Sequence, residues 1–305
     1  MKKQIVVFVI LTTFIVNVQA DDLSKGELAV AVIMQNSGIT VDTIPSVTTQ
    51  IVSSYEDQDV VTVNLQVSSL PTIHIFMKGP RGFLQDTTST YRVCFLVSGF
   101  LTGSQSAFLL PPTPNTVYVA YDYPYNAAYL QNDPNMFLEI FRVTPAQIAL
   151  SLKWISLQSW VNREKTVALG VSLGGLFLPV SLHIAQKLNA APMRSVFAFT
   201  GADVPAIIAN VLPAELPQGV SAATLFLLPA INIMNDPQLH LPALQGSFLV
   251  IRGDEDQVIP ADSTAKLFEL LPSPKQEVVL HGMHIDTGQT ELIDETGRAV
   301  LNWLK

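Results

Sequence analysis

The sequence predicts an α/β fold with a mostly parallel central sheet and helices on both faces. From Tyr91 onward, short runs of β-branched or apolar residues alternate with segments of helical length. Several of the short runs are apolar at consecutive positions, as in parallel strands that are covered on both faces. This alternation is typical of β-α-β units and predicts a doubly wound sheet.

Two strands are expected before Tyr91. Residues 61–67 alternate apolar and polar side chains, which is the period of a half-buried strand. Residues 72–77 form a second apolar run, and Gly79-Pro80-Arg81-Gly82 ends it with turn-forming residues. The later elements follow in chain order: strands 91–97 and 116–121, helix 145–162, strand 166–169, helix 173–188, strands 195–199 and 247–251, helix 261–271, strand 277–280 and helix 291–304.

The first twenty residues predict an export signal. Lys2 and Lys3 precede an almost unbroken apolar run at 5–18, and Val18-Gln19-Ala20 has small residues at the positions that a signal peptidase requires. The mature protein is expected to begin at Asp21 and to be periplasmic or extracellular, without a stable membrane span. An uncleaved anchor is the alternative. Residues 21–70 are expected to be a β-rich extension of the core with no assigned role, and residues 71–305 the α/β domain.

Composition limits the kind of partner. The chain has 17 Lys and Arg against 25 Asp and Glu, a net charge of −8, and no basic cluster. No nucleic-acid partner is expected, because phosphate binding needs clustered cationic side chains. The five histidines are scattered without the spacing of zinc ligands, so neither a metal nor a cofactor is expected. Cys94, the single cysteine, lies in an apolar run and is expected to be a small core residue.

Gly170-Val171-Ser172-Leu173-Gly174 follows the strand at 166–169 and opens an apolar helix. The pattern G-x-S-x-G at a strand-to-helix junction predicts a tight turn that exposes the serine hydroxyl in a strained backbone conformation. The helix that follows would direct its N-terminal dipole and free N–H groups toward a negative charge that develops beside the serine. Ser172 is therefore a candidate nucleophile.

A cluster of carboxylates follows the strand at 247–251. Asp254, Glu255 and Asp256 are consecutive there, and any one of them could accept a hydrogen bond from the Nδ1 atom of a histidine. The residue pattern does not choose among the three.

His281-Gly282-Met283-His284 follows the strand at 277–280. Histidine is the usual general base near neutral pH. Serine, acid and histidine thus occur in the chain order of a Ser-Asp-His triad, and each lies just after a predicted strand.

From about residue 72 to the C-terminus, these loops together resemble the α/β-hydrolase superfamily, which implies the α/β-hydrolase fold. The acid loop resembles the family pattern G-x-x-D-x-hydrophobic-hydrophobic-P, which selects Asp256, and the histidine loop resembles the family's G-x-H ending, which selects His284. Asp203, after the strand at 195–199, is an alternative acid, because some members of the family carry the acid there.

The resemblance also implies an oxyanion hole formed by the backbone N–H groups of Phe100 and Leu173, with Leu101 as the next choice. Phe100 lies in Val97-Ser98-Gly99-Phe100-Leu101-Thr102-Gly103, after the third expected strand. Ser98 stands where the family often has histidine, which leaves the identity of the first donor open between Phe100 and Leu101.

Residues 202–245 lie where the fold commonly inserts a cap, and they are rich in proline and apolar residues. A short cap with an apolar underside, suited to an acyl chain, is one interpretation, and packing against the core is the other. The resemblance implies a serine hydrolase that cleaves a small-molecule or lipid-like ester, like a carboxylesterase or lipase. A peptidase, thioesterase or acyltransferase would use the same residues, and a catalytically silent binding protein is a further alternative.

Overall fold

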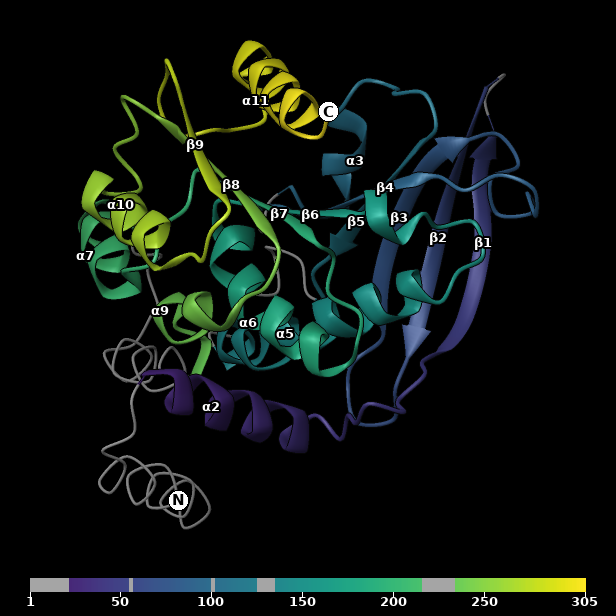
Figure 1. Cartoon of the computed structure of the whole chain (residues 1–305), viewed down its shortest axis with the longest axis horizontal. Coiled ribbons are helices and arrows are strands. Elements are labelled where there is room, and N and C mark those ends of the chain that lie inside the picture. Colours follow the sequence, from purple (N-terminus) through teal and green to yellow (C-terminus); the bar gives the residue numbers. More distant parts are fainter. Residues whose placement is uncertain (1–21, 55–56, 100–101, 125–134, 216–233) are drawn as a thin grey trace.

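The computed structural model describes residues 22–54, 57–99, 102–124, 135–215 and 234–305. The expected export signal at 1–20 lies outside these residues. Within them, nine strands form one sheet in the order β1-β2-β3-β5-β4-β6-β7-β8-β9 (Figure 1). The strands are β1 (Ser46–Ser54), β2 (Gln58–Gln66), β3 (Ile73–Pro80), β4 (Arg92–Val97), β5 (Thr116–Asp122), β6 (Val167–Val171), β7 (Arg194–Ala198), β8 (Ser247–Gly253) and β9 (Lys275–Leu280).

The sheet is antiparallel at one end and parallel over the rest. β1, β2, β3 and β5 pair antiparallel, whereas β5, β4, β6, β7, β8 and β9 pair parallel. The carboxyl ends of β4, β6, β7, β8 and β9 therefore lie at one edge of the sheet, which is where open α/β sheets bind their ligands.

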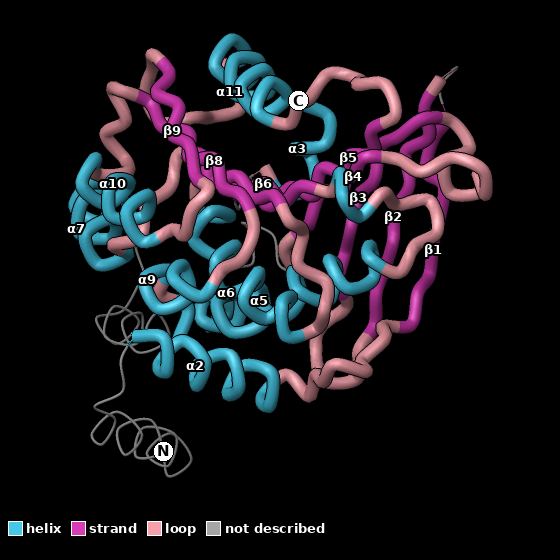
Figure 2. Tube along the Cα trace, in the orientation of Figure 1, coloured by secondary structure: helices cyan, strands magenta, loops and turns pink. Residues whose placement is uncertain are grey.

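Helices cover both faces of the sheet (Figures 1 and 2). On one face lie α2 (Asp22–Asn36), α5 (Asn135–Ser156), α6 (Leu173–Lys187) and α9 (Pro237–His240), and on the other lie α3 (Ser106–Leu109) and α11 (Thr290–Trp303). The remaining α-helices, α7 (Val204–Glu215) and α10 (Ala261–Leu270), lie beside each other near the β8–β9 end. The short 3-10 helices are η1 (Gly103–Gln105), η2 (Arg163–Lys165) and η3 (Leu241–Ala243).

Each face has its own hydrophobic core, and strand periodicity divides the side chains between them. In β6, Ala168 packs into the core beneath α5 and α6, whereas Val167 and Leu169 pack into the core beneath α3 and α11. Every residue from Val167 to Gly170 is buried, as expected for a strand covered on both faces. The fold class predicted from the sequence is thus confirmed.

Two elements lie where no matching element was expected. α2 occupies the first part of the segment for which a β-rich extension was expected, and it packs through Ala29, Val30 and Ile33, which are buried at helical spacing. β1 adds an edge strand whose residues are almost all exposed, so its sequence lacks the alternation that marks a half-buried strand. Among the described residues, the helices are too short or too polar to cross a bilayer.

Candidate active site

Ser172, Asp256 and His284 meet at the carboxyl edge of the sheet. They follow β6, β8 and β9, respectively. Ser172 Oγ lies 2.8 Å from His284 Nε2, and His284 Nδ1 lies 2.9 Å from Asp256 Oδ2. The imidazole therefore bridges the hydroxyl and the carboxylate, in the arrangement that activates a serine for nucleophilic attack.

Ser172 occupies a strained turn between β6 and α6. Its backbone angles are φ 53° and ψ −124°, a region that a residue with a side chain rarely adopts. Small neighbours make this turn possible. A Cβ atom on Gly174 would lie 1.9 Å from the carbonyl oxygen of Val97, and one on Gly170 would lie 2.8 Å from Gly175 Cα. The two glycines thus let α6 approach β4 and β6 closely enough for the serine to project from the sheet edge.

The Asp256 carboxylate is fully engaged by the protein. One oxygen contacts His284, and the other accepts the backbone N–H groups of Val258 and Ile259, each at 2.9 Å. Its side chain is only 5% exposed, and burial alone would raise its pKa. The hydrogen bonds from His284, Ile259 and Val258 outweigh burial, so the pKa of Asp256 lies below its ordinary value. The carboxylate is therefore ionised and held in one orientation toward the imidazole.

The other candidate acids have different partners. Asp203 Oδ1 accepts the N–H of Ala206 at 3.1 Å and so caps the start of α7. Asp254 accepts the N–H of Gly282 at 2.9 Å and pairs with His281 Nδ1 at 3.1 Å. Among the described residues, Asp256 is thus the candidate acid that contacts His284, and His284 is the histidine that contacts Ser172.

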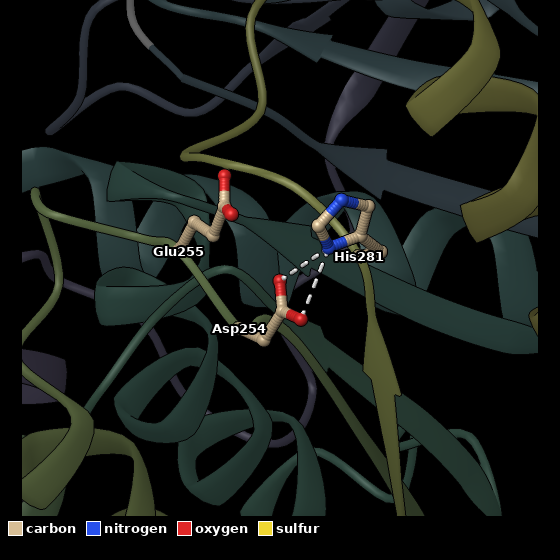
Figure 3. A group of neighbouring side chains, drawn as sticks. All are labelled: Asp254, Glu255 and His281. Atoms are coloured by element: carbon tan, nitrogen blue, oxygen red, sulfur yellow. Dashed lines mark hydrogen bonds and ion pairs between the residues drawn. The ribbon is translucent and has the colours of Figure 1, made fainter.

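Asp254, Glu255 and His281 form a separate exposed group beside these loops (Figure 3). Their ligand atoms lie within 4.8 Å of one another, and carboxylate and imidazole groups of this kind could hold a divalent cation. The His281 side chain is 81% exposed, and its pairing with Asp254 raises the pKa of the imidazole. The pKa of the Asp254 carboxyl is lowered by the hydrogen bond from the Gly282 N–H and by the pairing with His281. Within the described structure, Asp254 and His281 of this group form a surface ion pair that links the loops after β8 and β9.

The expected oxyanion hole is described only in part. Leu173 begins α6 directly after Ser172, so its N–H belongs to the first turn of that helix, where backbone N–H groups lack partners within the helix. Phe100 and Leu101 lie outside the described residues. The N–H groups of Thr102 and Gly103 both donate to the carbonyl of Gly99, each at 3.0 Å.

Tyr123 anchors the loop that precedes Phe100. Its buried hydroxyl donates to the Ser98 carbonyl at 2.8 Å, while Ser98 Oγ donates to the Gly103 carbonyl at 2.9 Å. Residue type alone did not reveal this role, because a tyrosine after a strand is as often a pocket residue as an anchor. The signal that could have found it is its position just after a strand that is buried at nearly every residue.

A pocket of about 370 Å³ opens beside Ser172 and His284. Besides these two residues, its lining comes from β4, β6, the start of α6, the segment 98–110 and the segment 285–296: Leu96, Ser98, Gly99, Thr102, Ser106, Leu109, Leu110, Leu169, Val171, Leu173, Ile285, Asp286, Thr287, Ile293 and Thr296. The expected cap at 202–245 is described only at 202–215 and 234–245, and no residue of those two parts lines the pocket. The apolar walls therefore come from the sheet, from α3 and the residue after it, from the first residue of α6, and from the segment that runs from Ile285 into α11.

No protein-family profile and no curated protein matches the sequence. Solved structures do match the fold. Acetyl xylan esterase 1 from Thermoanaerobacterium sp. JW/SL YS485 aligns with a TM-score of 0.63 at 12% identity, over 90% of this chain and 92% of that chain. Acetyl xylan esterase from Paenibacillus sp. R4 aligns with a TM-score of 0.61 at 14% identity, over 93% of this chain and 95% of that chain.

A third similar structure is a peptidase. Dipeptidyl peptidase 4 from Porphyromonas gingivalis aligns with a TM-score of 0.55 at 14% identity, over 81% of this chain and 36% of that chain. At these sequence identities the similarity shows the fold alone. With the strand order and the serine turn described above, it leads to one conclusion: this chain has the α/β-hydrolase fold.

Proposed function

We propose that this protein is a serine hydrolase that cleaves carboxylic esters through an acyl-enzyme. The observation that carries the proposal is the unbroken hydrogen-bond chain from Ser172 through His284 to Asp256, at the mouth of a pocket of about 370 Å³. A hydroxyl that is hydrogen-bonded in this way to a base, which is itself oriented by a carboxylate, can act as the nucleophile in acyl transfer.

The reaction begins when Ser172 Oγ attacks the ester carbonyl and His284 Nε2 takes the hydroxyl proton. Asp256 holds the ring with Nδ1–H toward the carboxylate, so that Nε2 presents a lone pair to the serine, and it stabilises the imidazolium that forms. The N–H of Leu173, together with that of Phe100, stabilises the negative charge on the carbonyl oxygen. Loss of one such donor typically costs about 10²–10³ in turnover.

The tetrahedral intermediate then expels the alcohol. His284 returns the proton to the departing oxygen, and the acyl group remains attached to Ser172. A water molecule occupies the place of the alcohol, gives its proton to His284 and attacks the acyl carbon. Release of the carboxylic acid restores the serine, and the cycle consumes only ester and water.

An ester is favoured over a peptide because of the pocket that adjoins the serine. Seven leucine and isoleucine side chains line it, and such apolar walls suit a hydrocarbon group. The proposal includes export, with a mature protein that begins at Asp21 after removal of the basic and apolar leader. Mass measurement of the protein recovered outside the cytoplasm tests that part separately.

The test of the activity compares p-nitrophenyl esters with aminoacyl p-nitroanilides as substrates. The wild type is expected to hydrolyse the esters, and Ser172→Ala is expected to lose that hydrolysis. Ser181→Ala is the matched control, because Ser181 lies in the same helix, α6, and donates its hydroxyl to the Phe177 carbonyl inside the protein. A wild type that cleaves only the anilides would replace the esterase assignment with a peptidase. Unchanged ester hydrolysis by Ser172→Ala would refute the nucleophile.

A further inference from the structure

The pocket beside Ser172 extends along one face of the sheet. Leu96 of β4 and Leu169 of β6 are register partners on neighbouring strands, and both pack into the core beneath α3 and α11. Leu110, just after α3, and Ile293, on α11, also line the pocket. In Figure 1, α3 and α11 lie on the face opposite α5 and α6. The pocket is therefore bounded by β4, β6, the segment 98–110, the start of α6 and the segment 284–296, and none of these belongs to the predicted cap.

The positions of the lining residues give the pocket a depth. Leu169, in the middle of β6, precedes Ser172 by three residues, so the two Cα atoms lie up to about 10 Å apart at ~3.3 Å per residue. Farther along α11, a Cβ atom on Gly297 would lie 3.6 Å from Leu110 Cδ2, which is ordinary van der Waals distance. α11 and the end of α3 thus approach each other closely there, next to the pocket.

Three hydroxyl groups in the pocket wall are already bonded within the protein. Ser98 and Ser106 both donate to the Gly103 carbonyl, at 2.9 and 2.8 Å, and Thr296 donates to the Leu292 carbonyl at 2.7 Å. A polar substituent in this part of the pocket would lose its hydrogen bonds to water without finding a free donor among these three groups, which disfavours its entry. A hydrocarbon group loses nothing there and buries its surface against leucine and isoleucine.

The two halves of an ester have different requirements around Ser172. The alcohol must lie beside His284 Nε2, which returns a proton to it. The His284 side chain is 16% exposed, and the adjacent Met283 is 56% exposed, so this side of the serine opens toward solvent. Val171 and Leu173, which flank Ser172 in sequence, line the pocket together with His284. The acyl carbon is bonded to the serine, so its chain has access to the pocket throughout the reaction.

We propose that the pocket between the sheet and the α3–α11 pair binds the acyl chain, that Leu169 sets the length of chain accepted, and that the alcohol lies toward solvent. A depth of about 10 Å corresponds to roughly six to eight carbons at ~1.3 Å per carbon, from C–C bonds of ~1.5 Å. The substrate class is then esters of medium-length fatty acids with varied alcohols. This inference rests on the proposed esterase function and adds the substrate class to it.

The experiment measures kcat/KM on acetyl, butanoyl, hexanoyl, octanoyl and decanoyl p-nitrophenyl esters. The wild-type value is expected to rise about fourfold per buried methylene until the pocket is full, and then to fall. Leu169→Ala lengthens the pocket, so its optimum is expected to move to a longer acyl chain while acetyl ester hydrolysis continues. Ile293→Ala, on the α11 wall, is a second variant with the same expected direction.

Val196→Ala is the matched control. Val196 of β7 is the register partner of Leu169 and lies in the same core, but it does not line the pocket. Its chain-length optimum is expected to equal that of the wild type. If the wild-type kcat/KM does not change with acyl-chain length, the acyl-pocket inference is overturned. The same follows if the chain-length optimum moves equally in Val196→Ala, or if it stays fixed in both Leu169→Ala and Ile293→Ala. In those cases ester hydrolysis persists. Absence of ester hydrolysis in the folded wild type would instead refute the proposed function.

Discussion

Replacement of Asp256 by Asn tests how the carboxylate acts on the histidine. The asparagine carbonyl oxygen can keep the two backbone hydrogen bonds from Val258 and Ile259, which Asp256 Oδ1 accepts at 2.9 Å each. The amide nitrogen would then face His284 Nδ1 at the position of Oδ2, 2.9 Å away. An amide N–H needs an acceptor, so the ring is expected to turn its Nδ1 lone pair toward Asn and carry its proton on Nε2.

That tautomer has no lone pair for the Ser172 proton. In serine-hydrolase triads the corresponding change costs about 10⁴ in kcat, which is about 5.4 kcal/mol of transition-state stabilisation. We expect a loss of the same order here with little change in KM, because Asp256 contacts the base and does not line the pocket. The fold should persist, since the backbone contacts of the loop are kept.

The assay is steady-state ester hydrolysis, with thermal unfolding as the check on folding. Asp254→Asn is the matched control, because it removes the same charge from the same loop, where Asp254 contacts only the exposed His281 and the N–H of Gly282 among the described side-chain partners. It is expected to retain activity within about threefold, as surface pairs contribute little. Asp256→Asn with kcat within tenfold of the wild type would refute the orienting role, and a larger loss in Asp254→Asn would move that role to Asp254.

Three further predictions concern packing, acid stability and positioning. Gly174→Ala forces a Cβ atom against a β4 carbonyl and is expected to lower the thermal midpoint of unfolding by several degrees, since overpacking typically costs about 1–3 kcal/mol. Gly297→Ala in α11, where a Cβ atom has room, should be neutral or stabilising. Burial lowers the pKa of His240 to about 4, so the unfolded chain binds its proton first. The free energy of unfolding should therefore fall as pH drops from about 6.5 to 4, by up to roughly 3 kcal/mol, and a pH series in which His240→Gln keeps the same slope would contradict this. Tyr123→Phe removes the donor to the Ser98 carbonyl and should lower kcat about tenfold at nearly constant KM. A raised KM with unchanged kcat would exclude a positioning role.

The residues of the candidate site could be predicted because their surroundings are strongly patterned. Ser172, Asp256 and His284 each lie within four residues of the end of a short strand, and the carboxyl ends of parallel strands meet at one sheet edge. The choice of Asp256 over its two acidic neighbours needed the resemblance. It depends on which carboxylate the loop turns inward, and residue type does not record that.

Other features depend on packing that local patterns do not encode. β1 is exposed on both faces, so its residues carry no alternation to detect. α2 had a readable signal in Ala29, Val30 and Ile33, which lie at helical spacing and are buried. The pocket arises where α3 and α11, far apart in the chain, meet over Leu96 and Leu169. The sequence instead directed attention to residues 202–245 as the apolar boundary of the site.

The central claim is that the imidazole of His284 activates the hydroxyl of Ser172. Labelling with a fluorophosphonate, followed by tandem mass spectrometry of the digested protein, tests it most directly. We expect the phosphonyl group on Ser172 of the wild type, and neither Ser172→Ala nor a folded His284→Ala should be labelled at a comparable rate. A phosphonyl group on another residue, or equal labelling of Ser172 after the loss of His284, would contradict the account.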